Sequence, residues 1–409
     1  MKEWKIYKIA DIVDEISMGP FGSNIKVENF ISEGIPVLNG SNLQGYRLNE
    51  ESFNYVSEEK ANSLGKANAY RGDVVITHRG TLGQIIYIPY DSKYERYVIS
   101  QSQFRLKLKK EIVRPDFLVY YFHTAIGQHK ILMNASQVGV PALARPTSTF
   151  REVTLPIPPM DIQNKIMDIL LSIDGKLTIN KQINDNLEQQ AQAIYKSWFI
   201  DFEPFKDGEF VESEIGLIPE GWKVGTLSDL AEITMGQSPS GKSYNECGEG
   251  ILFYQGRAEF GDRYPSIRLY TTEPSRIADQ NSVLLSVRAP VGDTNIAYNK
   301  CCIGRGLASI KAKHGFNSFI FYMIKSMKDQ FDMYNGEGTV FGSINRDSLN
   351  SLNVIVPTND VINEFEKIVA PLDLKYKSLF TENLLLTQQR DTLLPKLMSG
   401  ELKINELDC

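Results

Sequence analysis

Two stretches of the chain place apolar residues at spacings of three and four. They run from 162 to 198 and from 361 to 397. This spacing is typical of one face of an α-helix. Away from their ends, the stretches contain only two helix-disfavouring residues, Gly175 and Pro371. The pattern therefore predicts two helices of about 40 residues, each about 60 Å long at 1.5 Å per residue.

The remaining sequence is typical of β-structure. Short runs of β-branched and aromatic residues, such as 74–77, 85–90 and 282–287, are separated by Gly, Pro and Asn turns. Two further apolar runs, 115–130 and 317–331, have helical spacing, and one helix is expected in each. Each part of the chain outside the two long helices is thus predicted to be a mixed α/β globule.

The chain repeats itself. GIPVLNG at 34–40 resembles GILFYQG at 250–256, and LPIPP at 155–159 resembles VIVPT at 354–358. A long helical stretch follows both LPIPP and VIVPT. A unit of about two hundred residues is therefore used twice.

Connectivity suggests how the long helices pack. The first leaves one globule and ends at the other, so the second must return along the same path if the two apolar faces are to bury each other. The predicted fold class is α/β (α+β), with two mixed α/β domains separated by two long helices. These helices form an antiparallel coiled coil, and the internal repeat is pseudo-twofold. Helices that pack only on their own globules are the alternative.

The predicted domain boundaries follow the repeat. Asn184 and Asn383 fall inside the apolar stripes, where a polar residue can fix register. Trp198 and Phe199 are apolar residues that we expect to be left over for a partner. The boundaries are 1–159 for the first domain, 160–200 for the first long helix, 201–221 for a linker, 222–358 for the second domain, and 359–409 for the second long helix and tail.

Composition is that of a globular protein. The 409 residues are 42% hydrophobic and 23% charged, which excludes a disordered, collagenous or disulfide-stapled chain. No run of 18 uncharged apolar residues is present, the first residues are too acidic for a signal peptide, and the four cysteines form no CxxC pair. We expect a cytoplasmic protein with reduced thiols and no membrane partner.

The net charge of −6 hides its distribution. Residues 1–160 carry 19 basic and 16 acidic side chains, and 222–358 carry 14 and 13. The two predicted helical blocks hold the acidic excess. Each globule can therefore present a local basic face to nucleic acid.

One motif suggests an enzyme. GQSPSGKS at 236–243 matches the phosphate loop of nucleotide hydrolases, which requires a following helix. The next residues, YNECGEG, do not favour a helix, so contact with DNA phosphates is the preferred interpretation. The sequence offers no metal-ligand spacing and no Asn/Asp-Pro-Pro-aromatic loop for a flipped base. We expect neither a catalytic nor a metal site.

The chain resembles the specificity (S) subunit of Type I restriction-modification systems over nearly its whole length. The most specific segments are AIYKSWFIDF, LIPEGW and LLPKLMSGEL, at 193–202, 217–222 and 393–402. VRAPVG at 287–292 and GRGL at 304–307 also resemble that family's recognition domains. The first domain departs there, with HRGT at 78–81 and SQSQ at 100–103.

The resemblance implies a noncatalytic subunit that binds a bipartite, asymmetric target in double-stranded DNA. Each domain would bind one half-site, with a gap of fixed length between them. Two methyltransferase (M) subunits carrying S-adenosylmethionine would dock on the helices, and restriction (R) subunits using ATP and Mg would join them. No cofactor is expected in this chain. A free-standing DNA-binding or scaffold protein is the alternative.

Base recognition needs Arg, Gln, Asn, Ser or Thr at groove edges, and phosphate binding needs Lys or Arg. Arg79 and Arg288 are favoured, since each follows an apolar strand and precedes a Gly-containing turn. Four residues inserted within 176–192 are expected to change the preferred gap and to leave both half-sites unchanged. The DNA-binding candidates are Asn42, Gln44, His78, Arg79, Thr81, Gln101 and Gln103 in the first domain, and Lys242, Ser243, Tyr244, Arg257, Arg288 and Arg305 in the second.

Overall fold

The computed structural model describes residues 4–133, 135–136, 140–335 and 342–402. The chain forms two compact units. The first comprises residues 1–179 and 383–409, and the second comprises 180–382. Each unit therefore combines one globule with parts of both long helices.

The first unit is built on two four-stranded sheets. One is antiparallel throughout, and in the other the two central strands run parallel. The first sheet has the order β2 (Val13–Met18), β9 (Gln103–Leu108), β6 (Val74–Thr77) and β7 (Ile85–Tyr87); the second has β4 (Asn54–Val56), β3 (Ile35–Val37), β8 (Arg96–Val98) and β5 (Asn68–Tyr70).

The second unit repeats this topology. Its parallel central pair again lies in the second sheet, which gains one short outer strand, β17. The order is β16 (Ala231–Met235), β24 (Leu307–Ala312), β21 (Val283–Ser286) and β22 (Thr294–Ile296), then β17 (Tyr244–Asn245), β19 (Leu269–Thr271), β18 (Ile251–Tyr254), β23 (Cys301–Ile303) and β20 (Ile277–Ala278). The predicted internal repeat is confirmed.

Short elements complete both units, and two-stranded sheets join β1 to β12, β10 to β11, β13 to β14 and β15 to β25. Part of the segment 201–221, expected to be a linker, forms the β13–β14 hairpin. The strands are β1 (Lys5–Lys8), β10 (Ala135–Ser136), β11 (Ala142–Leu143), β12 (Thr154–Ile157), β13 (Phe210–Ser213), β14 (Gly216–Pro219), β15 (Lys223–Thr226) and β25 (Asn353–Val356). The helices are α1 (Ile9–Ile12), α2 (Glu58–Ser63), α5 (Pro146–Arg151), α7 (Leu227–Leu230) and α10 (Arg346–Asn350).

The two runs expected to form single helices are each broken in two. Residues 115–130 fall in α3 (Pro115–His123) and α4 (Ala125–Leu132), and 317–331 fall in α8 (Asn317–Ser326) and α9 (Lys328–Asp332). Thr124 has an extended backbone, and its hydroxyl accepts the Gly127 N–H at 3.1 Å. This side chain caps α4, and apolar spacing alone does not reveal such a break.

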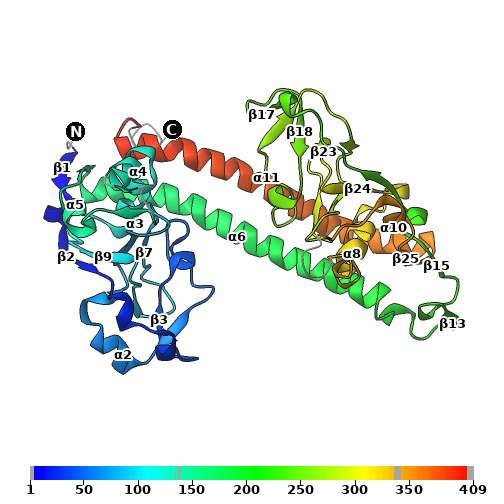
Figure 1. The fold of residues 1–409 in the computed structure, drawn as a ribbon, viewed down its shortest axis with the longest axis horizontal. Coiled ribbons are helices and arrows are strands. Elements are labelled where there is room, and N and C mark those ends of the chain that lie inside the picture. Colours follow the sequence, from blue (N-terminus) through cyan, green and yellow to red (C-terminus); the bar gives the residue numbers. More distant parts are fainter. Residues whose placement is uncertain (1–3, 134, 137–139, 336–341, 403–409) are drawn as a thin grey trace. The chain divides into compact units, whose positions relative to one another are not determined.

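The long helices are α6 (Met160–Phe199) and α11 (Asn359–Ser399), continuous as predicted (Figure 1). In the first unit, Arg390 donates to Asp174 at 3.0 Å. In the second, Asn180 donates to Glu382 at 2.7 Å, and the rings of Phe199 and Phe365 are 5.1 Å apart. The contact residues of α6, in the order 174, 180 and 199, meet residues 390, 382 and 365 of α11. The two helices therefore run in opposite directions, and the predicted antiparallel pairing is confirmed.

The helices also pack on the globules, so the two arrangements treated as alternatives coexist. In the first unit Phe117 of α3, Leu170 of α6 and Leu397 of α11 share one apolar core with the antiparallel sheet. In the second unit Phe199 is buried and Trp198 partly buried in the equivalent core. The expectation that these residues await a partner is therefore wrong for Phe199, whereas Trp198 keeps part of its surface exposed.

Candidate nucleic-acid interface

In the first unit several strands end at one edge. β2 and β6 both end beside the beginning of β9, and β3 and β8 run parallel and end together. The connections that leave these ends therefore gather at the same place. We name this surface the first loop edge, made of residues 19–24, 38–44, 78–83 and 99–102.

Backbone hydrogen bonds hold these loops together. Gly19 N–H donates to the carbonyl of Gln103 at 2.8 Å, and His78 N–H donates to that of Ser102 at 2.8 Å. The ring Nε2 of His78 lies 3.1 Å from the carbonyl of Gln101. Burial lowers the pKa of His78, which favours the neutral ring at neutral pH. His78 therefore serves mainly to connect two loops.

The second unit builds an equivalent edge from residues 236–240, 255–259, 287–292 and 304–306, the second loop edge. Gln237 N–H donates to the carbonyl of Ile303 at 3.0 Å, and Val287 N–H donates to that of Gly306 at 2.9 Å. These loops leave β16, β18, β21 and β23, which match β2, β3, β6 and β8 in sheet order. Both units thus present the same kind of surface at the same ends of their sheets.

A glycine stands where two loops cross in each unit. A Cβ on Gly19 would lie 1.9 Å from the carbonyl oxygen of Ser100, and one on Gly236 would lie 2.1 Å from that of Gly304. Backbone atoms cannot give way at such distances. Glycine at these two positions is therefore required by close packing of the loop edges.

At the first loop edge, the side chains of Gln44, Arg79, Thr81 and Gln101 are exposed. Arg79 lies two residues beyond the end of β6, and its backbone bridges to Ala142. The edge therefore presents a guanidinium together with amide and hydroxyl groups, which can donate to and accept from DNA bases.

Asn42 and Gln103 do not fit their predicted role. Asn42 is 1% exposed, and its amide donates to the carbonyls of Asn49 and Ser52 at 3.0 and 2.9 Å. Gln103 is fully buried and accepts the Ser100 N–H at 2.9 Å. These amides stabilise the loops, so the expectation that they contact bases is wrong for both.

At the second loop edge, Arg288 and Arg305 are exposed. No ion pair joins Arg79, Arg288 or Arg305 to a carboxylate among the residues that the structure describes. Arg257 is exposed too, but its guanidinium pairs with Asp293. Arg288 and Arg305 therefore keep their donors available for a ligand, whereas Arg257 is engaged within the protein.

The segment 241–243 is structural for the most part. Ser243 is buried, and its hydroxyl donates to the Ser240 carbonyl at 2.7 Å, so a DNA contact is ruled out for it. Tyr244 is partly buried and donates from its hydroxyl to the Pro239 carbonyl at 3.1 Å, whereas Lys242 is exposed. A 3-10 turn followed by β17 occupies the place of the helix that a phosphate loop requires.

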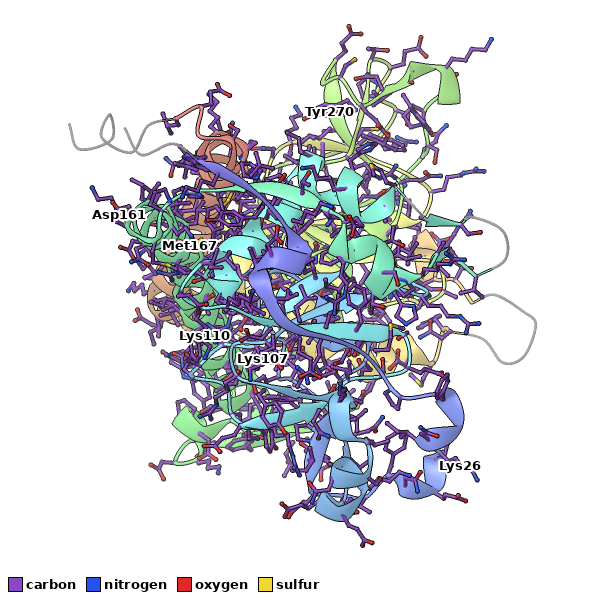
Figure 2. All side chains as sticks on the ribbon, turned by 90° about the vertical axis from the view of Figure 1, so that its left-hand side faces the viewer. Lys26, Lys107, Lys110, Asp161, Met167 and Tyr270 are labelled. Carbon is purple, nitrogen blue, oxygen red and sulfur yellow. The ribbon has the colours of Figure 1, made fainter. Side chains whose placement is uncertain are left out.

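Some exposed lysines were not among the DNA-binding residues predicted from the sequence. Figure 2 shows Lys107 and Lys110 on one side of the first unit and Lys26 on the other. Lys26 lies two residues beyond the loop 19–24, and its Nζ is 3.4 Å from Glu28. Nothing in the local sequence separates these lysines from ordinary solvated ones. Within the described residues there is no group of three potential metal ligands, and no helix there is long and apolar enough to cross a membrane.

The comparisons with known proteins all give one family and together cover nearly the whole chain. The family model for the Type I restriction modification DNA specificity domain matches residues 1–189 and 219–375. A putative type I restriction enzyme MjaX specificity subunit from Methanocaldococcus jannaschii is 30% identical, covering 98% of this chain and 94% of the relative. The HindI specificity subunit from Haemophilus influenzae is 25% identical, covering 98% and 100%. The crystal structure of a Type-I S subunit from M. genitalium shares the fold, with a TM-score of 0.62, 15% identity and coverage of 97% and 96%.

Proposed function

Because the chain belongs to the family of Type I restriction modification DNA specificity domains, we propose that it is the sequence-specificity subunit of a Type I restriction-modification enzyme. Each loop edge contacts one half-site of a bipartite target in double-stranded DNA. The observation that carries this proposal is the repetition of the edge, with Arg79 and Arg288 exposed at equivalent positions.

The differences between the edges support an asymmetric target. The first presents Gln44, Thr81 and Gln101 around Arg79, whereas the second presents Arg305 with Arg288, and the exposed Lys242 lies two residues beyond its 236–240 loop. Arginine suits the O6 and N7 acceptors of guanine, and glutamine suits the N6 and N7 groups of adenine. Two unlike edges therefore favour two unlike half-sites.

The long helices support a fixed gap. α6 has 40 residues and α11 has 41, and each contributes to the cores of both units. At 1.5 Å per residue each helix is about 60 Å long, roughly the length of 18 base pairs at 3.4 Å each. Helices of this length can separate two major-groove contacts by about one turn of DNA.

The chain acts without chemistry of its own in this proposal. Two methyltransferase subunits supply S-adenosylmethionine and modify adenine, and restriction subunits supply ATP-dependent cleavage with Mg. A free-standing DNA-binding protein is the less favoured function, since relatives that cover nearly the whole chain are named as subunits of restriction enzymes.

The test is a map of DNA methylation in a host that expresses this chain with and without a Type I methyltransferase subunit. We expect a two-part adenine-methylated motif that requires both proteins. The variant Arg288→Ala, which lacks one loop-edge arginine, should relax the sequence requirement in one half of the motif, and the matched control Lys300→Ala should leave both halves unchanged. Methylation that does not depend on this chain would contradict the proposal.

A further inference from the structure

Tyr46 and Arg263 occupy equivalent positions in the two units. The carbonyl of Tyr46 accepts the N–H of Tyr87 in β7 at 3.1 Å, and that of Arg263 accepts the N–H of Ile296 in β22 at 2.9 Å. β7 and β22 hold the same place in their sheets. Each residue lies on the segment that leaves β3 or β18 and forms part of a loop edge.

In the first unit this position contacts the helix pair through an aromatic ring. Tyr46 stacks on Tyr120 of α3, with ring centroids 4.1 Å apart and planes at 17°. The guanidinium of Arg390, on α11, lies 5.3 Å from the Tyr46 centroid. Arg390 donates to Asp174 of α6 at 3.0 Å, and Tyr120 donates to the same carboxylate. We name Tyr46, Tyr120, Asp174 and Arg390 the Asp174 cluster.

In the second unit the same position carries the cation. Arg263 is 2% exposed and donates to Asp373 of α11 at 2.5 Å. Tyr322 of α8 donates to the same carboxylate at 2.9 Å, and Glu188 of α6 lies 3.2 Å from Arg263 Nη1. The guanidinium also lies 4.6 Å from the ring centroid of Tyr376, on α11. We name Arg263, Tyr322, Asp373 and Glu188 the Asp373 cluster.

Each cluster contains a carboxylate and a tyrosine at equivalent positions, but the guanidinium comes from a long helix in one cluster and from the globule in the other. Tyr120 and Tyr322 are the sixth residues of α3 and α8, and Asp174 and Asp373 are the fifteenth residues of α6 and α11. In the first unit α11 supplies Arg390, and in the second unit the segment that leaves β18 supplies Arg263. The repeat places the buried Ala191 of α6 where α11 has Arg390.

Both clusters connect directly to a loop edge. Gln44 precedes Tyr46 by two residues, and Arg257 precedes Arg263 by six. Between the latter two, Gly261 is held by the Asn295 side chain through hydrogen bonds of 3.1 and 2.9 Å. A short chain segment therefore links each cluster to the adjoining loop edge.

Building on the proposed function, we propose that these clusters are positioning devices: they fix how each loop edge is oriented on its helix pair, and they determine which helix pair a recognition unit can pack on. A buried ion pair is directional and leaves an uncompensated charge when one partner is lost. A unit with tyrosine at this position fits a helix pair that supplies arginine. A unit with arginine fits a helix pair that supplies carboxylates and leaves a small residue opposite.

The first test is Tyr46→Leu, with Tyr90→Leu as the matched control. Tyr90 is an exposed tyrosine of the same unit, outside the cluster. The full chain, bound to its methyltransferase, is assayed on DNA targets whose gap is one base pair shorter, native or one longer. We expect Tyr46→Leu to lower the preference for the native gap roughly tenfold, with half-site sequences unchanged, because it removes ring stacking and a cation–π contact. The control should keep the preference.

The second test exchanges the arrangement. Arg263→Tyr removes the guanidinium from Asp373, and adding Ala191→Arg restores it from the helix side. We expect the single change to broaden the gap preference and the double change to narrow it again. Tyr322→Phe keeps both charges and should broaden the gap preference mildly. It tests the proposal even if the other variants fail to fold.

The outcomes separate this proposal from the function beneath it. Failure of the native chain to direct methylation at one gap would contradict the proposed function itself. A native chain that requires one gap, together with Tyr46→Leu and Tyr322→Phe variants that keep it unchanged, would overturn only the positioning role. Loss of half-site sequence preference at an unchanged gap would overturn it as well.

Discussion

Arg79 and Arg288 lie at the same place in the two repeats. Each is the second residue beyond its strand, β6 or β21, and each forms a backbone bridge, to Ala142 and Ser343 respectively. Their side chains are exposed at the first and second loop edges. The repeat therefore delivers one guanidinium to each proposed half-site.

Replacing Arg288 by alanine should weaken recognition of one half-site only. A bidentate arginine–guanine contact contributes about 1 to 3 kcal/mol of discrimination, so roughly a ten- to hundredfold loss is expected on the specific target. Lys300→Ala, which removes an exposed cation elsewhere in the same unit, is the matched control in a competition binding assay. An equal loss on unrelated DNA would instead identify Arg288 as a phosphate contact.

The crossing glycine at the second loop edge should not tolerate a side chain. Gly236→Ala would place a Cβ 2.1 Å from the carbonyl oxygen of Gly304, and such overpacking costs about 1 to 3 kcal/mol. We expect a lower melting temperature together with loss of second half-site binding. Gly241→Ala is the control, because no atom lies within 4 Å of its Cβ. Equal melting temperatures for the two variants would contradict the crossing as a structural requirement.

The first unit should have a pH-dependent stability that resides in Asp73. Burial raises the pKa of this carboxyl to about 6, despite Arg105 Nη1 at 3.3 Å. Because the unfolded pKa is near 3.9, the contribution is fully present below about pH 4 and is lost as the pH rises through 6. It amounts to about 2 to 3 kcal/mol. Urea unfolding of the native chain and of Asp73→Asn should therefore converge or cross between pH 4 and 7.

Glu15 provides a control of opposite sign for that measurement. A hydrogen bond from Ser17, together with Arg105, lowers the pKa of Glu15. Its contribution is present above the unfolded pKa and is lost as the pH falls through the lowered value. Glu15→Gln should thus alter stability at neutral pH and have little effect in strong acid. Parallel pH curves for the native chain and Asp73→Asn would refute the role of Asp73.

Lengthening the helices should change the gap of the DNA target. The antiparallel contacts of Asp174 with Arg390 and of Asn180 with Glu382 show that an insertion in α6 alone would break register. Four residues added between 174 and 180 therefore need four more in α11 between 382 and 390. The pair adds about 6 Å and should shift the preferred gap by one or two base pairs. Altered half-sites at an unchanged gap would refute this relation.

Much of the architecture could be predicted from local patterns. Apolar spacing predicts both long helices because periodicity records which face of a helix is buried. Repeated segments predict two similar units, and the need to cover two apolar stripes predicts the antiparallel direction. The sequence after Gly241–Ser243 predicts that no helix follows, and the structure has β17 there. Arg79, Arg288 and Arg305 are exposed at the loop edges, where their residue type and position suggested DNA contact.

The tertiary structure decided what local patterns leave open. Asn42, Gln103 and Ser243 have side chains suited to base recognition, but their environment buries them in hydrogen bonds within the loops. Asp174 and Asp373 are ordinary acidic positions in the helical periodicity, and only the fold brings a guanidinium to each. The sequence by itself determined the two long helices and the repetition of the unit, because apolar spacing and repeated segments can be read from the order of residues alone. Exposure and pairing depend on residues that can be 216 positions apart, as Asp174 and Arg390 are, and only the folded chain brings them together.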